Sequence, residues 1–329
     1  MVRRVRERVR PWGSWVSGSE EFEEVEMIEA LWGSFKALVE QGEIYLILLP
    51  IYTILLVGER IAHRWMSERP WNEADGAANV AITIGYLGLN VLVGHIVPLG
   101  AMAWIFNHAS LWSLEIGPVG WLVAFLLYDL AWYVDHRVAH RTGLFWAMHH
   151  VHHSSSEYNM TVASRGFLLD NTLLTRPLFY LLPVLGVSPF QFMVIITLTN
   201  ILGIAQHTGL VGRLGPLDWL LATPSNHRVH HGSNDKYLDR NYGEVLMIWD
   251  HLFGTWQREE ETPTYGVTEP IDTCNPLRIE VAGLQWLARK MGRASGPWDR
   301  LRCLFMPPGW EPDAAARAPR SPSPAPEGR

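Results

Sequence analysis

Cysteine is almost absent from this 329-residue chain. It occurs only at Cys274 and Cys303, with no CxxC pair. Two isolated cysteines provide neither a disulfide framework nor a zinc site built from thiolates. Any metal that the chain binds must therefore be held by nitrogen and oxygen atoms.

Excess positive charge is missing as well. The formal net charge is −6 at pH 7, so the chain has no overall basic field, and we expect no nucleic-acid partner. It also has no GxGxxG nucleotide fingerprint and no CxxCH haem-attachment motif. The reductant for any redox reaction is therefore expected to come from outside the chain. The basic N-terminus is followed by acidic residues rather than an apolar core, so we predict no cleaved signal peptide.

Long apolar runs are plentiful. They alternate with charged stretches and predict an all-α fold, a polytopic membrane helix bundle. The last run contains prolines that should divide it into a helical hairpin. Arginines such as Arg60, Arg137 and Arg213 follow the first run, the third run and the hairpin, which places these regions in the cytoplasm by the positive-inside tendency. The four runs are residues 44–57, 80–106, 121–134 and 167–205.

Histidines form three boxes with helical spacing. Residues three and four apart share one face of a helix, so their imidazoles can converge. Eight histidines are too many for one tetrahedral zinc ion, and two metals sharing them is the economical hypothesis. The boxes are HxxxH at His136 and His140, HxxHH at His149, His152 and His153, and HxxHH at His227, His230 and His231.

A few other histidines need separate treatment. His207, at the end of the predicted hairpin, is a candidate ninth ligand, because an ionisable group at a membrane helix end calls for a function. His150 would point about 100° away from His149 on a helix, so we do not expect it to bind metal. The remaining four lack the box spacing and read as ordinary histidines: His63, His95, His108 and His251.

Acidic residues near the boxes are candidate partners for the histidines. A ligating histidine usually donates its second ring N–H to a carboxylate or carbonyl. Asp129 lies seven residues before His136, on nearly the same helix face and in an apolar run, and is the leading candidate. Arg165, Asn241 and Tyr242 either line a substrate entrance or cap helices. The other candidate acids are Asp135, Glu157, Asp239 and Asp250.

The boxes HRVAH, HHVHH and HRVHH, separated by apolar spans, resemble the fatty acid hydroxylase and sterol desaturase superfamily of membrane di-iron enzymes. The resemblance covers most of residues 128–256. The flanking segments LFWAMHHVHHSSSEYN and DRNYGEVLMIWDHLFGT are most similar to its alkylglycerol monooxygenase branch. It implies membrane helices topped by a cytosolic helical cap that holds two iron ions, with all eight box histidines and His207 as ligands.

The resemblance also implies a reaction. Such an enzyme uses O2 to hydroxylate a C–H bond of a membrane lipid, here the carbon next to the ether oxygen of alkylglycerols. Tetrahydrobiopterin or an electron-transfer protein would be the reductant. The implied organisation is a polar arm with an amphipathic helix at 1–43, a catalytic domain at 44–258, a cytosolic extension at 259–311 and a disordered tail at 312–329.

Two alternatives stay open at this point. The same centre could desaturate or hydroxylate a sterol or a fatty acyl chain, or hydroxylate a lipid headgroup. Outside enzymes, the chain could be a histidine-rich membrane protein that only binds metal. Metal carriers often use mobile low-complexity tracts, whereas these histidines have fixed helical spacing, which favours the enzyme.

Overall fold

The computed structural model of the protein describes residues 33, 45–93, 96–115, 117–169 and 175–312. All helices and turns assigned in these residues agree with the predicted all-α class, and the one extended pairing among them is an isolated bridge between Leu221 and Leu246. The amphipathic helix and the tail expected at the two ends lie outside the described residues, apart from residues 33 and 312.

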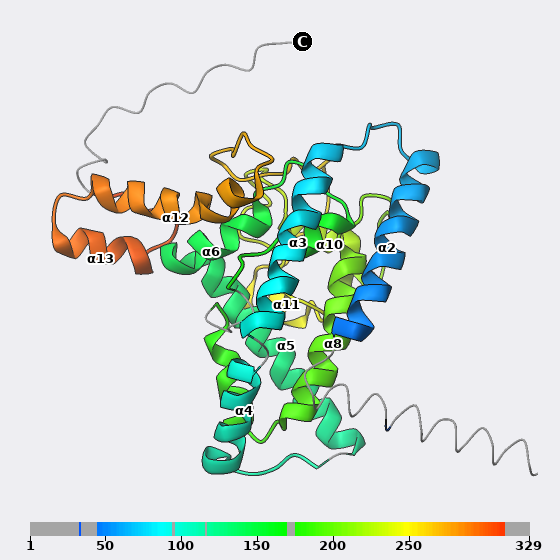
Figure 1. The fold of residues 1–329 in the computed structure, drawn as a ribbon, viewed down its shortest axis with the longest axis vertical. Helices are drawn as coiled ribbons and strands as arrows, with labels where there is room; N and C mark the ends of the chain where they lie inside the picture. The colour runs from blue at the N-terminus through cyan, green and yellow to red at the C-terminus, as the bar shows by residue number, and fades with distance from the viewer. Residues whose placement is uncertain (1–32, 34–44, 94–95, 116, 170–174, 313–329) are drawn as a thin grey trace, which may run out of the picture.

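Four long helices run along the longest axis of the molecule, and a shorter one, α4, lies at one end (Figure 1). A core of apolar side chains, including Tyr128, Phe179 and Phe192, packs α4, α5 and α8 against the segment at 177–187. The long helices are α2 (Tyr45–Met66), α3 (Glu73–Val93), α5 (Pro118–Arg141) and α8 (Pro189–Gln206), and α4 spans Ile96–Ala109.

Within the apolar run at 80–106, predicted to cross once, the described residues lie on α3, described to Val93, and on α4, described from Ile96. The residues between them lie outside the described part of the chain.

The helical hairpin predicted at 167–205 is not formed by two long helices in the described residues. Only its second arm is a long helix, α8. The described part of the first arm forms two short helices, η3 (Pro177–Tyr180) and α7 (Leu181–Val184). Gly186 then turns the chain with φ +85°, where a Cβ would lie 2.7 Å from Trp112, and Ser188 caps α8 by accepting from the Gln191 N–H. By length and composition, α8 is the one helix in the described part of the chain that could cross a membrane.

The turn expected between the first two histidine boxes is present. Thr142 is extended and separates α5 from α6 (Gly143–His153). A Cβ at Gly143 would lie 2.1 Å from the Cys303 carbonyl oxygen, so only glycine lets the two segments approach this closely. The extended Thr142 turns the chain so that α6 packs beside α5, and Gly143 lets the segment that carries Cys303 approach the start of α6.

Short helices and loops cover the histidine-bearing end of the bundle, and a helical hairpin packs against α6 (Figure 1). The hairpin consists of α12 (Pro276–Arg293) and α13 (Pro297–Phe305). The amphipathic helix predicted at 284–291 is part of α12, which is longer than predicted. The covering elements are η1 (Met160–Ser164), α9 (Leu217–Leu220), α10 (Pro224–His230) and α11 (Ile248–Phe253).

The packing of α12 on α6 yields a test of the fold. A Cβ at Gly283 would lie 1.9 Å from the Ala147 carbonyl oxygen, whereas a Cβ at Gly292 on the same helix would meet nothing within 4 Å. We expect Gly283→Ala to lower the free energy of unfolding by about 1–3 kcal/mol through overpacking. Gly292→Ala should leave it unchanged or raise it by up to about 1 kcal/mol. Thermal unfolding of the purified protein in detergent, followed by circular dichroism, measures both; equal shifts would contradict this packing.

Candidate metal centre

The nine histidines predicted as ligands lie together in two groups at the covered end of the bundle. Within each group the nearest ring nitrogens all lie within 4.8 Å of one another. The groups are adjacent, since the rings of His153 and His231 stack with centroids 4.3 Å apart. The first group is His136, His140, His149, His153 and His230; the second is His152, His207, His227 and His231.

Helix geometry divides each HxxHH box between the groups. Consecutive residues on a helix point about 100° apart, so His152 joins the second group and its neighbour His153 the first. On α10 the assignment is reversed, because His230 joins the first group and His231 the second. Each HxxHH box thus contributes two histidines, four residues apart, to one group and its remaining histidine to the other group.

Backbone carbonyls fix the tautomers of four rings. A carbonyl oxygen can only accept a hydrogen bond, so each Nδ1 beside one must carry the proton. In the neutral ring the Nε2 atom is then an acceptor with a free lone pair. The bonds run from Nδ1 of His136 to Tyr242 (2.9 Å), of His152 to Arg165 (3.1 Å), of His207 to Gly203 (2.7 Å) and of His230 to Arg240 (3.0 Å).

These lone pairs converge on one another. The Nε2 atoms of His207 and His152, both without a proton, are 3.3 Å apart, and Nε2 of His230 lies 3.1 Å from Nε2 of His153. His152 and His207 thus present two acceptors to each other, and these repel at this distance unless a cation lies between them. Imidazole nitrogens bind zinc at roughly 2.0–2.1 Å, so neighbouring ligands of one such ion are about 3 Å apart. The donor set therefore fits a first-row transition metal in each group.

Burial keeps these imidazoles neutral. Desolvation lowers the pKa of His207 and His230 to about 4. It also lowers the pKa of the other seven, and neighbouring imidazoles lower it further, because a second positive charge would be repelled. Neutral imidazole is the form that binds metal, so the site needs no deprotonation near pH 7.

His140 has a buried ring nitrogen without a hydrogen-bond partner. Its Nε2 atom is buried and has no hydrogen-bond partner in the structure. Its Nδ1 lies 3.8 Å from Asp239 Oδ1, which makes Asp239 the candidate acid nearest to a histidine nitrogen. Asp239 has φ +59°, a conformation that aspartate tolerates better than most residues, and it also pairs with Arg141 at 2.9 Å.

Asp129, the leading candidate partner from the sequence, contacts a loop rather than a histidine. Its carboxylate accepts hydrogen bonds from the Val245 N–H (3.1 Å), the Leu246 N–H (3.3 Å) and the Trp249 indole (2.9 Å). This loop follows Tyr242, whose carbonyl orients His136. Asp129 therefore acts on the site through the loop, which spacing along α5 could not reveal.

Three more candidate acids have roles away from the histidine nitrogens. Asp250 accepts from the N–H groups of Tyr242 and Gly243 at 2.9 and 2.8 Å and so holds the same loop as Asp129. Asp135 accepts from the Leu178 N–H at 3.1 Å. Glu157 lines a pocket beside the second group.

Arg165 and the 241–242 pair support the site instead of lining an identified entrance. Arg165 is 1% exposed and pairs with Asp75 at 2.8 Å, which holds the Arg165 carbonyl against His152. Asn241 donates to the Asn226 and Gln257 carbonyls. The Tyr242 ring lies edge-on to His136 and His140.

The histidines not expected to bind metal lie apart from both groups. His150 is buried against Trp146, and burial lowers its pKa to about 4. His63 packs edge-on against Trp71, His108 Nδ1 donates to the Trp104 carbonyl, and the His251 ring lies tilted against Trp219. His95 lies outside the described residues.

Tyr158 is a site residue that the sequence reasoning missed. Its ring stacks on His207, with centroids 5.7 Å apart, and meets His231 edge-on at 5.4 Å. Its hydroxyl donates to the Gln206 carbonyl at 3.0 Å. A lone tyrosine in a polar loop gives no periodic signal, and only the fold brings it to the second group.

Comparisons with known proteins agree with this site. Residues 121–255 match the family model for fatty acid hydroxylases. Human alkylglycerol monooxygenase is 33% identical over 281 residues, which cover 85% of this chain and 62% of that protein. The Xenopus tropicalis alkylglycerol monooxygenase is 32% identical over 275 residues, 83% of this chain and 60% of that protein. The ornithine lipid hydroxylase OlsE of Rhizobium tropici is 30% identical over 201 residues, 57% of this chain and 60% of that protein.

The chain spans about 60% of the length of these relatives. No solved structure matches it. The matched segment contains all nine clustered histidines. Residues 121–255 thus match the fatty acid hydroxylase family, as the histidine boxes predicted, and over most of its length the chain is similar to alkylglycerol monooxygenases.

Proposed function

We propose that this protein is an integral membrane di-iron oxygenase that uses O2 to hydroxylate a C–H bond of a lipid. The observation that carries the proposal is the convergence of neutral Nε2 atoms in two adjacent groups, one of five and one of four histidines. Nitrogen-rich sites of this kind suit iron among the redox-active metals. Two iron ions held there would supply the O2 activation that oxidation of an unactivated C–H bond requires.

The protein's own residues would orient and enclose the site. Backbone carbonyls of Tyr242, Arg165, Gly203 and Arg240 hold four rings in place, and such partners usually set both the orientation and the basicity of a ligating imidazole. Buried Tyr242 contacts the first group and half-buried Tyr158 contacts the second. Exclusion of water by these rings would protect a strong oxidant from side reactions.

A bilayer location is supported by large apolar side chains exposed on the long helices. Soluble proteins rarely expose such side chains over a broad surface. They occur on α2, α3, α5 and α8, including Ile54, Ile84, Leu122 and Leu198. We propose a multi-pass arrangement with the histidine site on the cytoplasmic side, where a lipid chain would reach the centre from the membrane and the polar loops would face water.

Alkylglycerol ethers are the proposed substrates, because most of the chain is similar to alkylglycerol monooxygenases. Insertion of one oxygen atom at the carbon beside the ether oxygen would give a hemiacetal, which collapses to an aldehyde and glycerol. The other oxygen atom becomes water, with two electrons and two protons from an external donor, tetrahydrobiopterin or an electron-transfer protein. Hydroxylation of another lipid is the second candidate, favoured by the similarity to an ornithine lipid hydroxylase and a sphingolipid C4-hydroxylase.

The ligand assignment is tested by metal content. We expect about two iron ions per chain, one for each group, and loss of iron from His153→Ala and from His231→Ala. Activity should fall at least about 100-fold, since even removal of an outer partner commonly costs 10–100-fold. His150→Gln is the matched control, because His150 is buried on the same helix but belongs to neither group. Elemental analysis showing zinc alone, or full iron in both alanine variants, would refute the di-iron assignment.

The substrate is tested by O2 uptake and product analysis. With a reductant present, the iron-loaded protein should consume O2 in the presence of a 1-O-alkylglycerol and release a fatty aldehyde with glycerol. One atom of ¹⁸O2 should enter the aldehyde or its hemiacetal precursor under rapid trapping. A matched 1-acylglycerol, which is an ester, is the control and should give no cleavage. Turnover of a sterol, an acyl lipid or ornithine lipid instead would retain the oxygenase and replace the substrate.

A further inference from the structure

The α12–α13 hairpin exposes a stripe of apolar side chains on each of its helices. The residues of each stripe are three and four apart, so they share one face of the helix. Leu277 is 77% exposed and Trp298 is 68% exposed, and soluble proteins rarely expose contiguous apolar surface of this kind. The stripes are Leu277, Val281, Leu284 and Ala288 on α12, and Trp298, Leu301 and Phe305 on α13.

A different face of the hairpin is fixed to α6, which carries the second histidine box. Trp286 and Leu287 belong to a buried apolar cluster with Ala147 of α6, and α13 joins this cluster through Cys303. Ile279 is buried in another cluster with residues of α6 and α3. Because this face is already packed, the stripes cannot turn inward, and a surface that binds them would also hold α6.

Arginines lie beside the stripe on α12. Arg278 and Arg289 each follow a stripe residue directly, so both lie about 100° around the helix from the stripe. They are exposed, as is Arg300 on α13. In the described part of the chain, the ion pairs of the hairpin involve Arg293 and Arg302 instead. The hairpin has six arginines and lysines against two acidic residues, although the whole chain has a net charge of −6.

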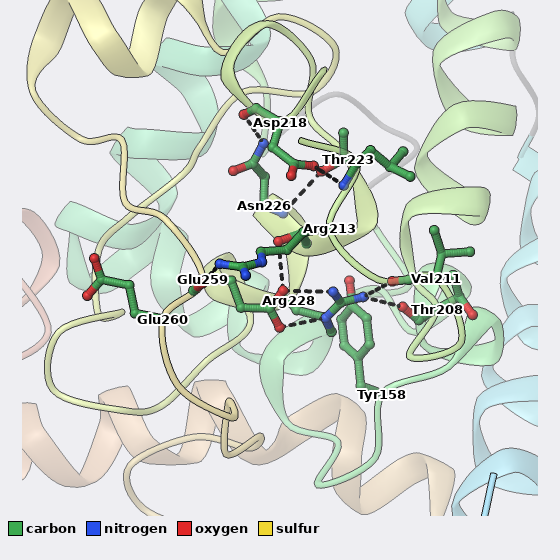
Figure 2. A network of polar contacts seen from close by, with 12 residues as sticks. Tyr158, Thr208, Val211, Arg213, Asp218, Thr223, Asn226, Arg228, Glu259 and Glu260 are labelled. Atoms are coloured by element: carbon green, nitrogen blue, oxygen red, sulfur yellow. Dashed lines mark hydrogen bonds and ion pairs between the residues drawn. The ribbon is translucent and has the colours of Figure 1, made fainter. Parts of the chain in front are cut away.

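Arginines in the loops that cover the histidines are bound within the protein. Figure 2 shows Arg228 held by both oxygens of the Glu259 carboxylate, at 2.8 and 2.7 Å, and Arg213 donating to the Glu259 carbonyl. The carboxylate neutralises the charge of Arg228, because a bidentate pair of this kind uses the donors of the guanidinium. The three exposed hairpin arginines without such a partner are available to an external anion.

A membrane surface fits this combination of features. Helices that lie in the membrane interface have Trp, Phe and Leu on one side and arginines beside them. Figure 1 shows the hairpin projecting sideways from the bundle, across the direction of the long helices. It also packs on α3 through Ile279, and α3 exposes Ile84 on the surface proposed to face lipid. The hairpin therefore adjoins that surface.

A second copy of the chain fits less well. The spacing of the α12 stripe is that of a coiled-coil seam, but the stripe spans less than two heptads, whereas a coiled coil needs about three or four. Two copies would also bring arginines of like charge together, which is unfavourable in an interface.

We propose that the α12–α13 hairpin lies on the cytoplasmic surface of the bilayer, with its apolar stripes among the lipid chains and Arg278, Arg289 and Arg300 bound to the phosphates of anionic phospholipids. The proposal rests on the membrane location given in the proposed function. Because the hairpin packs on α6, this attachment would hold the second histidine box at a fixed height above the lipid that supplies the substrate.

The attachment is tested by spin labelling of the full chain in lipid nanodiscs. A nitroxide at Leu284→Cys, in protein that carries Cys274→Ser, reports access to O2, which concentrates in lipid, and to a water-soluble nickel chelate. We expect access to O2 to exceed access to the chelate, as it should for a label at Leu198→Cys on α8. The reverse is expected at Asp235→Cys in a polar loop. Leu198 and Asp235 are both exposed, and the remaining Cys303 is buried.

The lipid class is tested by replacing phosphatidylcholine in the discs with increasing shares of phosphatidylglycerol. Access of the chelate to the label at residue 284 should fall as this share rises. The share that gives half of the change should increase at least about threefold in R278Q/R289Q, since each arginine near an anionic surface adds to binding. R213Q/R258Q removes two exposed charges outside the hairpin and should leave the share unchanged. An unchanged share in R278Q/R289Q would overturn the proposal.

The outcomes separate this inference from the proposed function. An iron-loaded, active protein whose label at residue 284 stays open to the chelate in every disc would overturn the lipid surface alone. Shielding by phosphatidylglycerol in a protein that binds no iron would refute the oxygenase and leave the surface standing. Dipolar broadening between labels, with low access to both reagents, would assign the stripe to a second copy of the chain and overturn the proposal.

Discussion

The structure depends on one electrostatic constraint, the convergence of imidazole lone pairs in a buried space. Four of the rings have their Nδ1 protons fixed by carbonyls, so their Nε2 atoms cannot donate to one another. The Nε2 atoms of His152 and His207 face each other at 3.3 Å as two acceptors, and a buried acceptor without a partner costs roughly 1–3 kcal/mol. A bound cation would accept these lone pairs and so stabilise the folded state. Metal binding would then contribute to the free energy of folding.

Most of the polar interior holds that arrangement in place from a distance. Asp129 and Asp250 fix the loop that supplies the Tyr242 carbonyl, and Arg165, paired with Asp75, presents its own carbonyl to His152. Buried ionisable groups are expensive unless they are fully bonded. Their bonds here go to the backbone that orients the rings, which explains why acids so close to the histidines in sequence do not touch them.

The sequence predicted the histidines well and the helices around them less well. Periodicity identified eight of the nine clustered histidines and excluded His150, because ligands on one helix follow the 3.6-residue repeat. His207 was identified instead by its position at the end of an apolar segment. It could not predict the carbonyl partners, since every residue carries a carbonyl and only the fold selects one. Tyr158 was missed because no local pattern marks a contact formed between segments far apart in the sequence.

The two histidine groups differ in size and in surroundings. The larger group adjoins the apolar core, and the smaller adjoins a polar cavity. The group of five contacts Trp132 through His136, and Trp132 belongs to the apolar core of α5 and α8. The group of four contacts Tyr158, beyond which lies an acidic cavity. An apolar substrate and a polar reductant have opposite solvation needs, so one entrance could serve both only poorly. Under the proposed function, separate approaches, from the helix bundle to the first group and from the polar loops to the second, would let each reactant stay in its preferred medium until it reaches the centre.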